Sequence, residues 1–509
     1  MRKNKVQPAH KSYFLGQGYK DIGTAIKTSW LKNAQTAKAY YDKYSEKGLM
    51  SLKGVYNLFC ALSVVSFGTV FFALISAVMV TFVSLFFVLV YIGFSAAWIF
   101  DQAYLARKKI FTACNECKCK SLIPTYICPK CGAHHTNLTP GAYGILNRTC
   151  KCGEKLPTTF FNGRKKLKAI CPNCLLEGKT TYLNDCESRQ LCVPVVGGRS
   201  VGKTAYITAF SKKFVEFVAP QNNLEIEFYN GAKEAIYSEI KADFAHGSTR
   251  MTVRPQDITQ SSSISFSFFV KHKALKPERL MHIYDIAGEV FTDNNENEVQ
   301  RQYEYCQGII FIIDPFAIPT VRAKYEALLT PEDRAGIGKA DINGIINVFI
   351  NKLREVTGLS DRKMSKVPIA IVIGKTDSAN LRDEFSDEKI EEIEYLNTKT
   401  EIHRSDAIDY LCRKFLKENE MESFVNAIEM KFKNNRFFAA SAIGHTRDAG
   451  AYNPVGVLEP MEWICTITDK KLASLWVKEK YAKKPLTKII DELEAVSYTH
   501  LTLPTILLV

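Results

Sequence analysis

Residues 54–100 contain no Asp, Glu, Lys or Arg. Soluble cores rarely run for 47 residues without a charge, so this absence argues against a wholly soluble protein. As one helix the run would be about 70 Å long, whereas about 20 helical residues cross the hydrocarbon of a bilayer. We therefore expect a two-helix transmembrane hairpin in residues 54–101, with a tight turn near Ser76–Thr81.

The first 53 residues have no apolar run and few acidic side chains, with three Asp or Glu against eleven Lys or Arg. We expect no cleavable secretory signal here. Apolar residues recur at helical spacing from Ile22 to Tyr41, which predicts a basic juxtamembrane helix within residues 1–53. That helix would lie either on the anionic inner leaflet or against the protein.

Basic residues flank both ends of the apolar run, so the positive-inside rule predicts a multi-pass protein of the cell (inner) membrane with its soluble domains facing the cytoplasm. The chain has too few acidic residues to balance its basic ones, and its net charge is +14. That charge suits nucleic acid, a membrane surface or bound phosphate, and alone it selects none of them. The 509 residues predict two or three folded units.

Most of the 15 cysteines lie between residues 114 and 192. Without a secretory signal, spaced cysteine pairs indicate metal ligands rather than disulfides. We predict tandem zinc ribbons in residues 110–185, each holding one structural Zn²⁺. The first site would use Cys114, Cys117, Cys128 and Cys131, and the second would use Cys150, Cys152, Cys171 and Cys174. Cys119 is left over as an alternate ligand or an ordinary thiol.

Ribbons of this size fold around their metal and commonly act as adaptors, so we expect an unidentified protein partner. The basic run at residues 163–168 leaves nucleic acid open as a further partner, although a solvated surface is the plainer interpretation.

The tripeptide Gly-Lys-Thr occurs at residues 178, 202 and 374. A phosphate loop needs Gly-x4-Gly-Lys-Ser/Thr between a strand and a helix, and only the copy at 202 completes it. The loop consists of Gly197, Gly198, Arg199, Ser200, Val201, Gly202, Lys203 and Thr204. Lys203 would bridge the β- and γ-phosphates, and Thr204 would ligate Mg²⁺. Pro194 lies in the preceding strand, where we expect a local bulge.

The rest of a nucleotide site follows in order along the chain. A buried strand leads to Asp285 and Gly288, which would hold Mg²⁺ through water and sense the γ-phosphate. Glu289 either orients the attacking water or is a surface residue. Further apolar strands at 308–315, 367–377 and 436–443 alternate with helical stretches. This pattern predicts a doubly wound α/β fold with its ligand at the carboxyl ends of the strands.

The run Lys375-Thr376-Asp377 resembles the guanine-specificity motif Asn/Thr-Lys-x-Asp of TRAFAC-class P-loop GTPases, and Ser441-Ala442 resembles its companion loop. The resemblance implies that Asp377 pairs with guanine and that Lys375 lies along the base. Gly374 departs from the motif, which leaves the preference for guanine over adenine open. With the cysteine pairs, "VGGRSVGKT" and "YDIAGE", the chain also resembles bacterial double-GTPase-type proteins that carry zinc ribbons.

That resemblance implies a P-loop GTPase domain at residues 190–480 that binds Mg²⁺ and GTP and hydrolyses GTP as a signalling or conflict-system switch. The alternative is a membrane scaffold that binds nucleotide without turnover. Thr249 and Thr252 are candidate switch residues, and Arg250 and Arg254 are candidate arginine fingers. A C-terminal tail follows at residues 481–509, and its uncharged end at 496–509 resembles a sequencing read-through product to which we assign no role.

Overall fold

The computed structural model divides the chain into two compact units. The first comprises residues 1–112 and 121–187, and the second comprises residues 188–509 together with 113–120. The structure describes residues 7–13, 17–114, 116–117, 119–183, 188–245, 265–285, 306–338, 341–357, 366–395, 401–444, 452–482 and 485–486.

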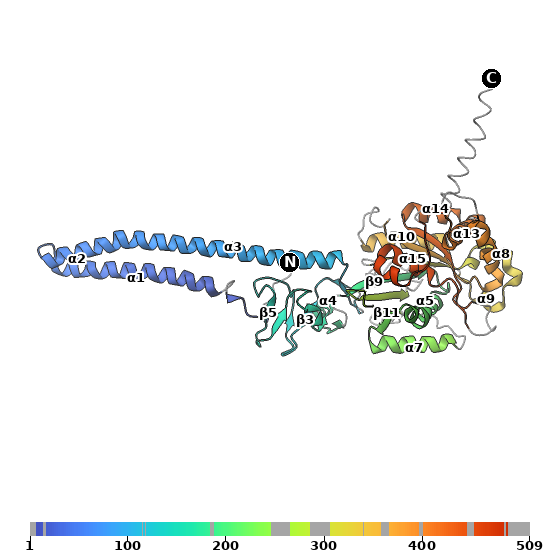
Figure 1. Ribbon diagram of the computed structural model, residues 1–509, viewed down its shortest axis with the longest axis horizontal. Coiled ribbons are helices and arrows are strands. Elements are labelled where there is room, and N and C mark those ends of the chain that lie inside the picture. Colours follow the sequence, from blue (N-terminus) through green and yellow to red (C-terminus); the bar gives the residue numbers. More distant parts are fainter. Residues whose placement is uncertain are drawn as a thin grey trace, which may run out of the picture. The chain divides into compact units, whose positions relative to one another are not determined.

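The first unit contains a helical hairpin (Figure 1). Its helices are α1 (Gln17–Lys47), α2 (Leu52–Ser63) and α3 (Thr69–Arg107), and a π-helical turn, Val64–Gly68, joins α2 to α3. Residues 52–107 are thus one continuous helix, the one helix in the described part of the chain that is long and apolar enough to cross a membrane.

The turn predicted near Ser76–Thr81 is wrong, because α3 runs through that segment without a break. The segment contains no glycine or proline, so nothing in it favours ending a helix. The two-helix transmembrane hairpin predicted in residues 54–101 is therefore one continuous helix, and the bend of the observed hairpin lies before it, between α1 and α2, in residues 48–51.

Helix α1 contacts α2 and α3 along their apolar surface. The ring of Tyr19 meets that of Phe87 edge-on at 4.9 Å between centroids, and Trp30 Nε1 donates a hydrogen bond of 3.1 Å to Ser76 Oγ. The sequence left open whether this basic helix lies on the inner leaflet or against the protein. In the structure it packs against the protein.

Short strands follow, as expected for small ribbons. A four-stranded sheet has the order β4-β3-β7-β8, and a separate hairpin pairs β5 with β6. The bounds are β1 (Thr112–Ala113), β2 (Lys120–Ser121), β3 (Thr125–Ile127), β4 (His134–His135), β5 (Asn147–Thr149), β6 (Lys155–Pro157), β7 (Ala169–Ile170), α4 (Pro172–Leu176) and β8 (Tyr182–Leu183).

The second unit is built on a seven-stranded sheet with the order β10-β11-β12-β9-β13-β14-β15. The five strands from β12 to β15 in this order are parallel, and β10 and β11 add an antiparallel edge. Their bounds are β9 (Arg189–Gly197), β10 (Glu225–Phe228), β11 (Ser265–Lys271), β12 (Arg279–Asp285), β13 (Ile309–Ile313), β14 (Ile369–Ile373) and β15 (Asn435–Ala439). This is the doubly wound α/β sheet that the sequence predicts.

Pro194 causes no bulge, contrary to the sequence-based expectation. The register between β9 and β12 continues through the Pro194–Tyr284 pair. On the other side, Cys192 exchanges hydrogen bonds with Gln307, and the ladder to β13 starts only at Val195. Residues two apart on a strand present their backbone groups to the same side, so the missing N–H of Pro194 points to β13 before that ladder begins.

Helices cover both faces of the sheet, as alternation along β13 shows. Ile310 and Ile312 pack into a core shared with α5, α15 and α16, whereas Phe311 meets Phe349 of α10 and Phe424 of α14 on the other face. The helix bounds are α5 (Lys203–Lys213), α6 (Ala219–Gln221), α7 (Gly231–Ala245), α8 (Pro319–Tyr325), α9 (Pro331–Ala335), α10 (Ile342–Thr357), α12 (Asp387–Glu394), α13 (Arg404–Glu418), α14 (Glu422–Lys431), α15 (Glu459–Thr468) and α16 (Lys470–Trp476).

Candidate nucleotide site and cysteine clusters

The phosphate-loop sequence joins β9 to α5. Strand β9 ends at Gly197, and α5 begins at Lys203 with Gly202 as its N-cap. Gly202 has a φ of 89°, a left-handed conformation that glycine adopts without steric cost. A Cβ on Gly197 would lie 2.5 Å from the carbonyl oxygen of Ile312, so a side chain here would push β9 away from β13. The strand, loop and helix that a phosphate loop requires are all present.

Three polar side chains meet where this loop enters α5. Lys203 Nζ donates hydrogen bonds to the carbonyl oxygens of Gly197 (3.2 Å) and Gly198 (2.7 Å). Thr204 Oγ1 donates to Asp285 Oδ2 at 2.6 Å, and all three side chains are buried. Because β9 and β12 are parallel neighbours, Asp285 reaches the loop from the carboxyl end of its strand. An ammonium, a hydroxyl and a carboxylate in this order are the groups that bind phosphates and Mg²⁺ in P-loop proteins.

The residues predicted for the base side lie at the neighbouring strand ends. Strands β14 and β15 end as a register pair, Ile373 with Ala439, so the loops carrying Lys375–Asp377 and Ser441–Ala442 start side by side. Ser441 is buried and its Oγ accepts a hydrogen bond from the backbone N–H of Gly444 at 2.7 Å, which closes that loop. Asp377 is half-buried at the start of the next helical turn.

Gly374 connects the two ends of the site. A Cβ at this position would lie 3.3 Å from Ile312 Cγ2 and 3.6 Å from the carbonyl oxygen of Val201. The guanine-type motif thus touches both β13 and the phosphate loop at the residue where it departs from Asn or Thr. A larger side chain would have to displace atoms on β13 by a few tenths of an ångström.

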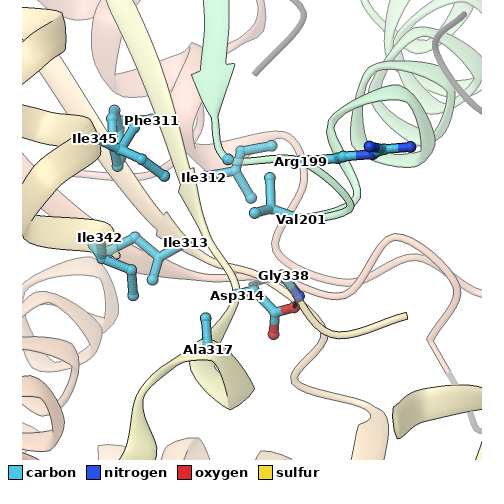
Figure 2. Close-up of a pocket in the computed structure, with 11 residues that line it drawn as sticks. Arg199, Val201, Phe311, Ile312, Ile313, Asp314, Ala317, Gly338, Ile342 and Ile345 are labelled. Carbon is cyan, nitrogen blue, oxygen red and sulfur yellow. Dashed lines mark hydrogen bonds between the residues drawn. The ribbon is translucent and has the colours of Figure 1, made fainter. Parts of the chain in front are cut away.

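Sequence reasoning missed Asp314, which follows β13. Its carboxylate is buried, and Oδ2 accepts hydrogen bonds from Lys375 Nζ at 2.7 Å and from the backbone N–H of Gly338 at 3.1 Å. Lys375 Nζ also donates to the carbonyl oxygen of Gly336 at 2.9 Å. Figure 2 shows Asp314 and Gly338 beside Val201, at the edge of a small pocket lined by the phosphate loop and β13. A charged residue directly after a buried strand was the available signal.

Several predicted residues lie outside the described part of the chain. They are the γ-phosphate sensor Gly288, the candidate water-orienting Glu289, and the candidate switch and finger residues Thr249, Arg250, Thr252 and Arg254. Their predicted roles stay predictions.

The eight predicted zinc ligands form two groups of four, but the pairs combine differently from the prediction. One group holds Cys114, Cys117, Cys171 and Cys174, and the other holds Cys128, Cys131, Cys150 and Cys152. Within each group the sulfur atoms lie within 4.8 Å of one another, and Cys119 is in neither. The sequential assignment is wrong because long-range strand pairing decides which knuckles meet. Strand β3 pairs with both β4 and β7. This pairing separates Cys171 and Cys174, which follow β7, from Cys150 and Cys152, the pair before them in the sequence.

The second group has the dimensions of a tetrahedral zinc site. Cys128 Sγ lies 3.6 Å from Cys152 Sγ, and Cys131 Sγ lies 3.6 Å from Cys150 Sγ. Zn–S distances of about 2.3 Å place tetrahedral sulfurs about 3.8 Å apart, whereas a disulfide bond is about 2 Å long. The backbone N–H of Glu154 lowers the pKa of Cys152 to about 7, whereas burial raises the pKa of Cys150 to about 12, so the fit to a metal rests on the distances. Four thiols at these distances fit Zn²⁺.

Comparisons with known proteins agree with this geometry. Residues 191–427 match the model of the family Double-GTPase 2. No curated protein matches the chain. Among solved structures, the chain is similar to the GTPase-like domain of Ski7 from S. cerevisiae bound to GDP and inorganic phosphate, with 10% identity, a TM-score of 0.25, and coverage of 56% of this chain and 50% of that chain.

The same Ski7 domain bound to GTP matches with 9% identity, a TM-score of 0.24 and the same coverage of 56% and 50%. LeoA, a bacterial dynamin GTPase from ETEC, matches with 12% identity and a TM-score of 0.23, over 62% of this chain and 40% of that one. The chain thus spans half or less of these proteins, and scores this low carry no argument. Residues 191–427 thus match the model of the double-GTPase 2 family, and the strand order and the phosphate loop of this region are those of a GTPase-like α/β fold.

Proposed function

We propose that this protein binds Mg²⁺ and GTP at the carboxyl edge of the seven-stranded sheet, hydrolyses GTP, and does so while anchored to a membrane. The observation that carries the proposal is the buried Thr204–Asp285 hydrogen bond of 2.6 Å beside Lys203. Burying an ammonium and a carboxylate is costly, and a charged ligand that contacts both offsets that cost.

Lys203, Thr204 and Asp285 would hold the triphosphate and its Mg²⁺. The ammonium of Lys203 would exchange the carbonyl oxygens of Gly197 and Gly198 for phosphate oxygens, which carry more negative charge. The Thr204 hydroxyl would ligate Mg²⁺, and Asp285 would hold it through water. Backbone N–H groups at the start of α5 add partial positive charge at the same place. Bound Mg²⁺ would neutralise charge that develops on the phosphates during hydrolysis.

Guanine would lie against Lys375 and pair with Asp377. Support comes from the paired ends of β14 and β15, which bring the loops of Asp377 and Ser441 together, and from the contact distance between Gly374 and the phosphate loop. We infer that Asp314 positions Lys375 along the base, since the two side chains form an ion pair of 2.7 Å.

Anchoring is proposed from the helix that spans residues 52–107. Its residues 54–100 carry no charge, and large apolar side chains along it are exposed. Exposed apolar surface of this extent costs far more free energy in water than in hydrocarbon. The uncharged run is longer than the roughly 20 residues that one crossing needs. The helix therefore has to tilt or bend in the membrane, or α1 has to cover the part that extends beyond the hydrocarbon.

Phosphate release and nucleotide binding by the full chain in detergent test the proposal. The key variant is Lys203→Ala, and the matched control is Lys179→Ala, the same change in an exposed Gly-Lys-Thr outside the phosphate loop. We expect GTP binding and phosphate release in the wild type and in Lys179→Ala, and neither in Lys203→Ala. GTP binding without phosphate release would favour the scaffold alternative, and binding that survives Lys203→Ala would contradict the assigned site.

A further inference from the structure

The basic loop at residues 159–168 has no part in the nucleotide site. Its side chains Lys165, Lys166 and Lys168 are exposed, and Phe161 is 58% exposed. A single exposed apolar side chain is common on a protein surface, whereas a continuous exposed apolar patch marks an interaction site. The surroundings of this ring indicate what it contacts.

Buried polar contacts fix the loop to the end of α3. The Asp101 carboxylate accepts hydrogen bonds from Arg164 Nη1 at 2.9 Å and from the backbone N–H of Phe160 at 2.8 Å. Both members of this ion pair are almost fully buried, with side chains 0% and 1% exposed. Arg164 also donates to the carbonyl oxygens of Leu138 and Thr158, which ties the same arginine to the rest of the ribbon. The loop is therefore held at one level along α3.

That level is the boundary of the apolar run. Asp101 is the first charged residue after residues 54–100. The ring of Phe161 contacts the rings of Phe100, directly before Asp101, at 5.7 Å and of Tyr104, three residues after it, at 4.6 Å between centroids. Phe100 is itself 62% exposed, so Phe161 extends an apolar surface that α3 already presents.

Aromatic rings beside lysines are the side chains that favour the interface between hydrocarbon and headgroups. Aromatic residues are enriched at headgroup level, and lysines near an anionic surface are attracted to its headgroups. A single-stranded RNA would also suit the lysines and an exposed ring. It would, however, bring phosphates against the apolar end of α3, where Trp98, Ile99 and Phe100 are exposed.

We propose that loop 159–168 is a second membrane contact, in which Phe161 enters the interface and the three lysines bind anionic lipid headgroups. The ribbon, which Arg164 fixes to α3, would then also contact the bilayer surface at the point where α3 leaves the membrane. This inference rests on the proposed anchoring by α2 and α3, and its test separates the two.

The test is photo-crosslinking of the full chain in nanodiscs that contain anionic lipid, with p-benzoylphenylalanine placed at one position at a time. Position 161 tests the loop. Position 82, on α3 and 69% exposed, reports the anchor. Position 182, an exposed tyrosine (60%) on the edge strand β8, is the matched ribbon control. Zinc content of each variant reports whether the ribbons have folded.

We expect lipid adducts at 82 and 161 and none at 182. Exchanging Lys165 and Lys166 for glutamine should reduce the share of anionic lipid among the adducts at 161 without changing adducts at 82. Adducts at 82 but not at 161 would overturn the inference and leave the anchor standing. Absence at both positions would overturn the anchor and the inference with it. If added RNA replaces lipid in the adducts at 161, the loop is a nucleic-acid site and the inference is wrong.

Discussion

Replacing Asp314 by asparagine tests whether this buried carboxylate positions the base-side lysine. Asparagine keeps the shape of the side chain but only one acceptor oxygen, so one of the two backbone N–H groups that Asp314 now binds, Phe316 at Oδ1 or Gly338 at Oδ2, can retain its partner. The change removes the negative charge that pairs with Lys375 at 2.7 Å. Lys375 then loses its ion pair but keeps the hydrogen bond to the carbonyl oxygen of Gly336, so its side chain is less well ordered.

The expected magnitude follows from the burial of the pair. A hydrogen bond between charged groups contributes roughly 1.5–3 kcal/mol, and the lower end applies because Lys375 is 25% exposed. A loss of about 1.4 kcal/mol corresponds to about a tenfold increase in the Kd for GTP. The isolated change in charge also lowers stability, so affinity alone does not establish positioning.

A double-mutant cycle separates the two effects. GTP affinity is measured by titration for the wild type, Asp314→Asn, Lys375→Ala and the double variant, with thermal unfolding recorded for each. We expect the double variant to bind GTP as weakly as Lys375→Ala, which gives a coupling energy near 1.4 kcal/mol. Additive losses, with a coupling energy near zero, would refute the argument that Asp314 acts through Lys375.

Three further predictions follow from other parts of the structure. Asp469→Ala removes the carboxylate that pairs with Arg279, whose side chain is 2% exposed, and should lower the free energy of unfolding by about 3–5 kcal/mol in urea titrations; a loss below about 1 kcal/mol would contradict a buried pair. Burial raises the pKa of Glu462 to about 7 from 4.5, so the folded state holds this proton more tightly. Its contribution to stability is full below pH 4.5 and is lost as the pH rises through 7, and Glu462→Gln should flatten that slope in thermal unfolding; an unchanged slope would assign it to other groups. Elemental analysis should find two Zn²⁺ per chain and one in Cys150→Ser, and Co²⁺ substitution should give tetrahedral thiolate spectra; an unchanged zinc content would exclude the second group as a site.

The GTPase-like sheet could be predicted from the sequence because its signals are local. Strands β13 and β14 are short, fully apolar runs, β9 contains such a run before the loop, and the phosphate loop requires glycines at fixed spacing. The carboxyl ends of parallel neighbours share one edge, so Thr204 and Asp285 could be expected to meet despite their separation in the chain.

The missed features depend on contacts that no local pattern records. Two cysteines spaced by two residues can chelate one metal, but which pairs share it depends on the pairing of β3 with β7. The uncharged run contains glycines at 68 and 93, but no residue near its middle marks a turn, so one long helix and two shorter helices give the same sequence pattern. Of the partners of Asp314, Gly338 lies in a segment between α9 and α10 and Lys375 follows β14, so their meeting depends on tertiary packing.

Nucleotide selectivity of the full chain tests the central claim most directly. Equilibrium binding of labelled GTP and ATP in the presence of Mg²⁺ is compared for the wild type and for Lys203→Ala. The account predicts that GTP binds the wild type, that ATP does not compete, and that Lys203→Ala abolishes binding, because the triphosphate depends on the phosphate loop and the base on Lys375 and Asp377. Equal affinity for GTP and ATP would contradict the guanine site, and GTP binding unaffected by Lys203→Ala would contradict the phosphate loop.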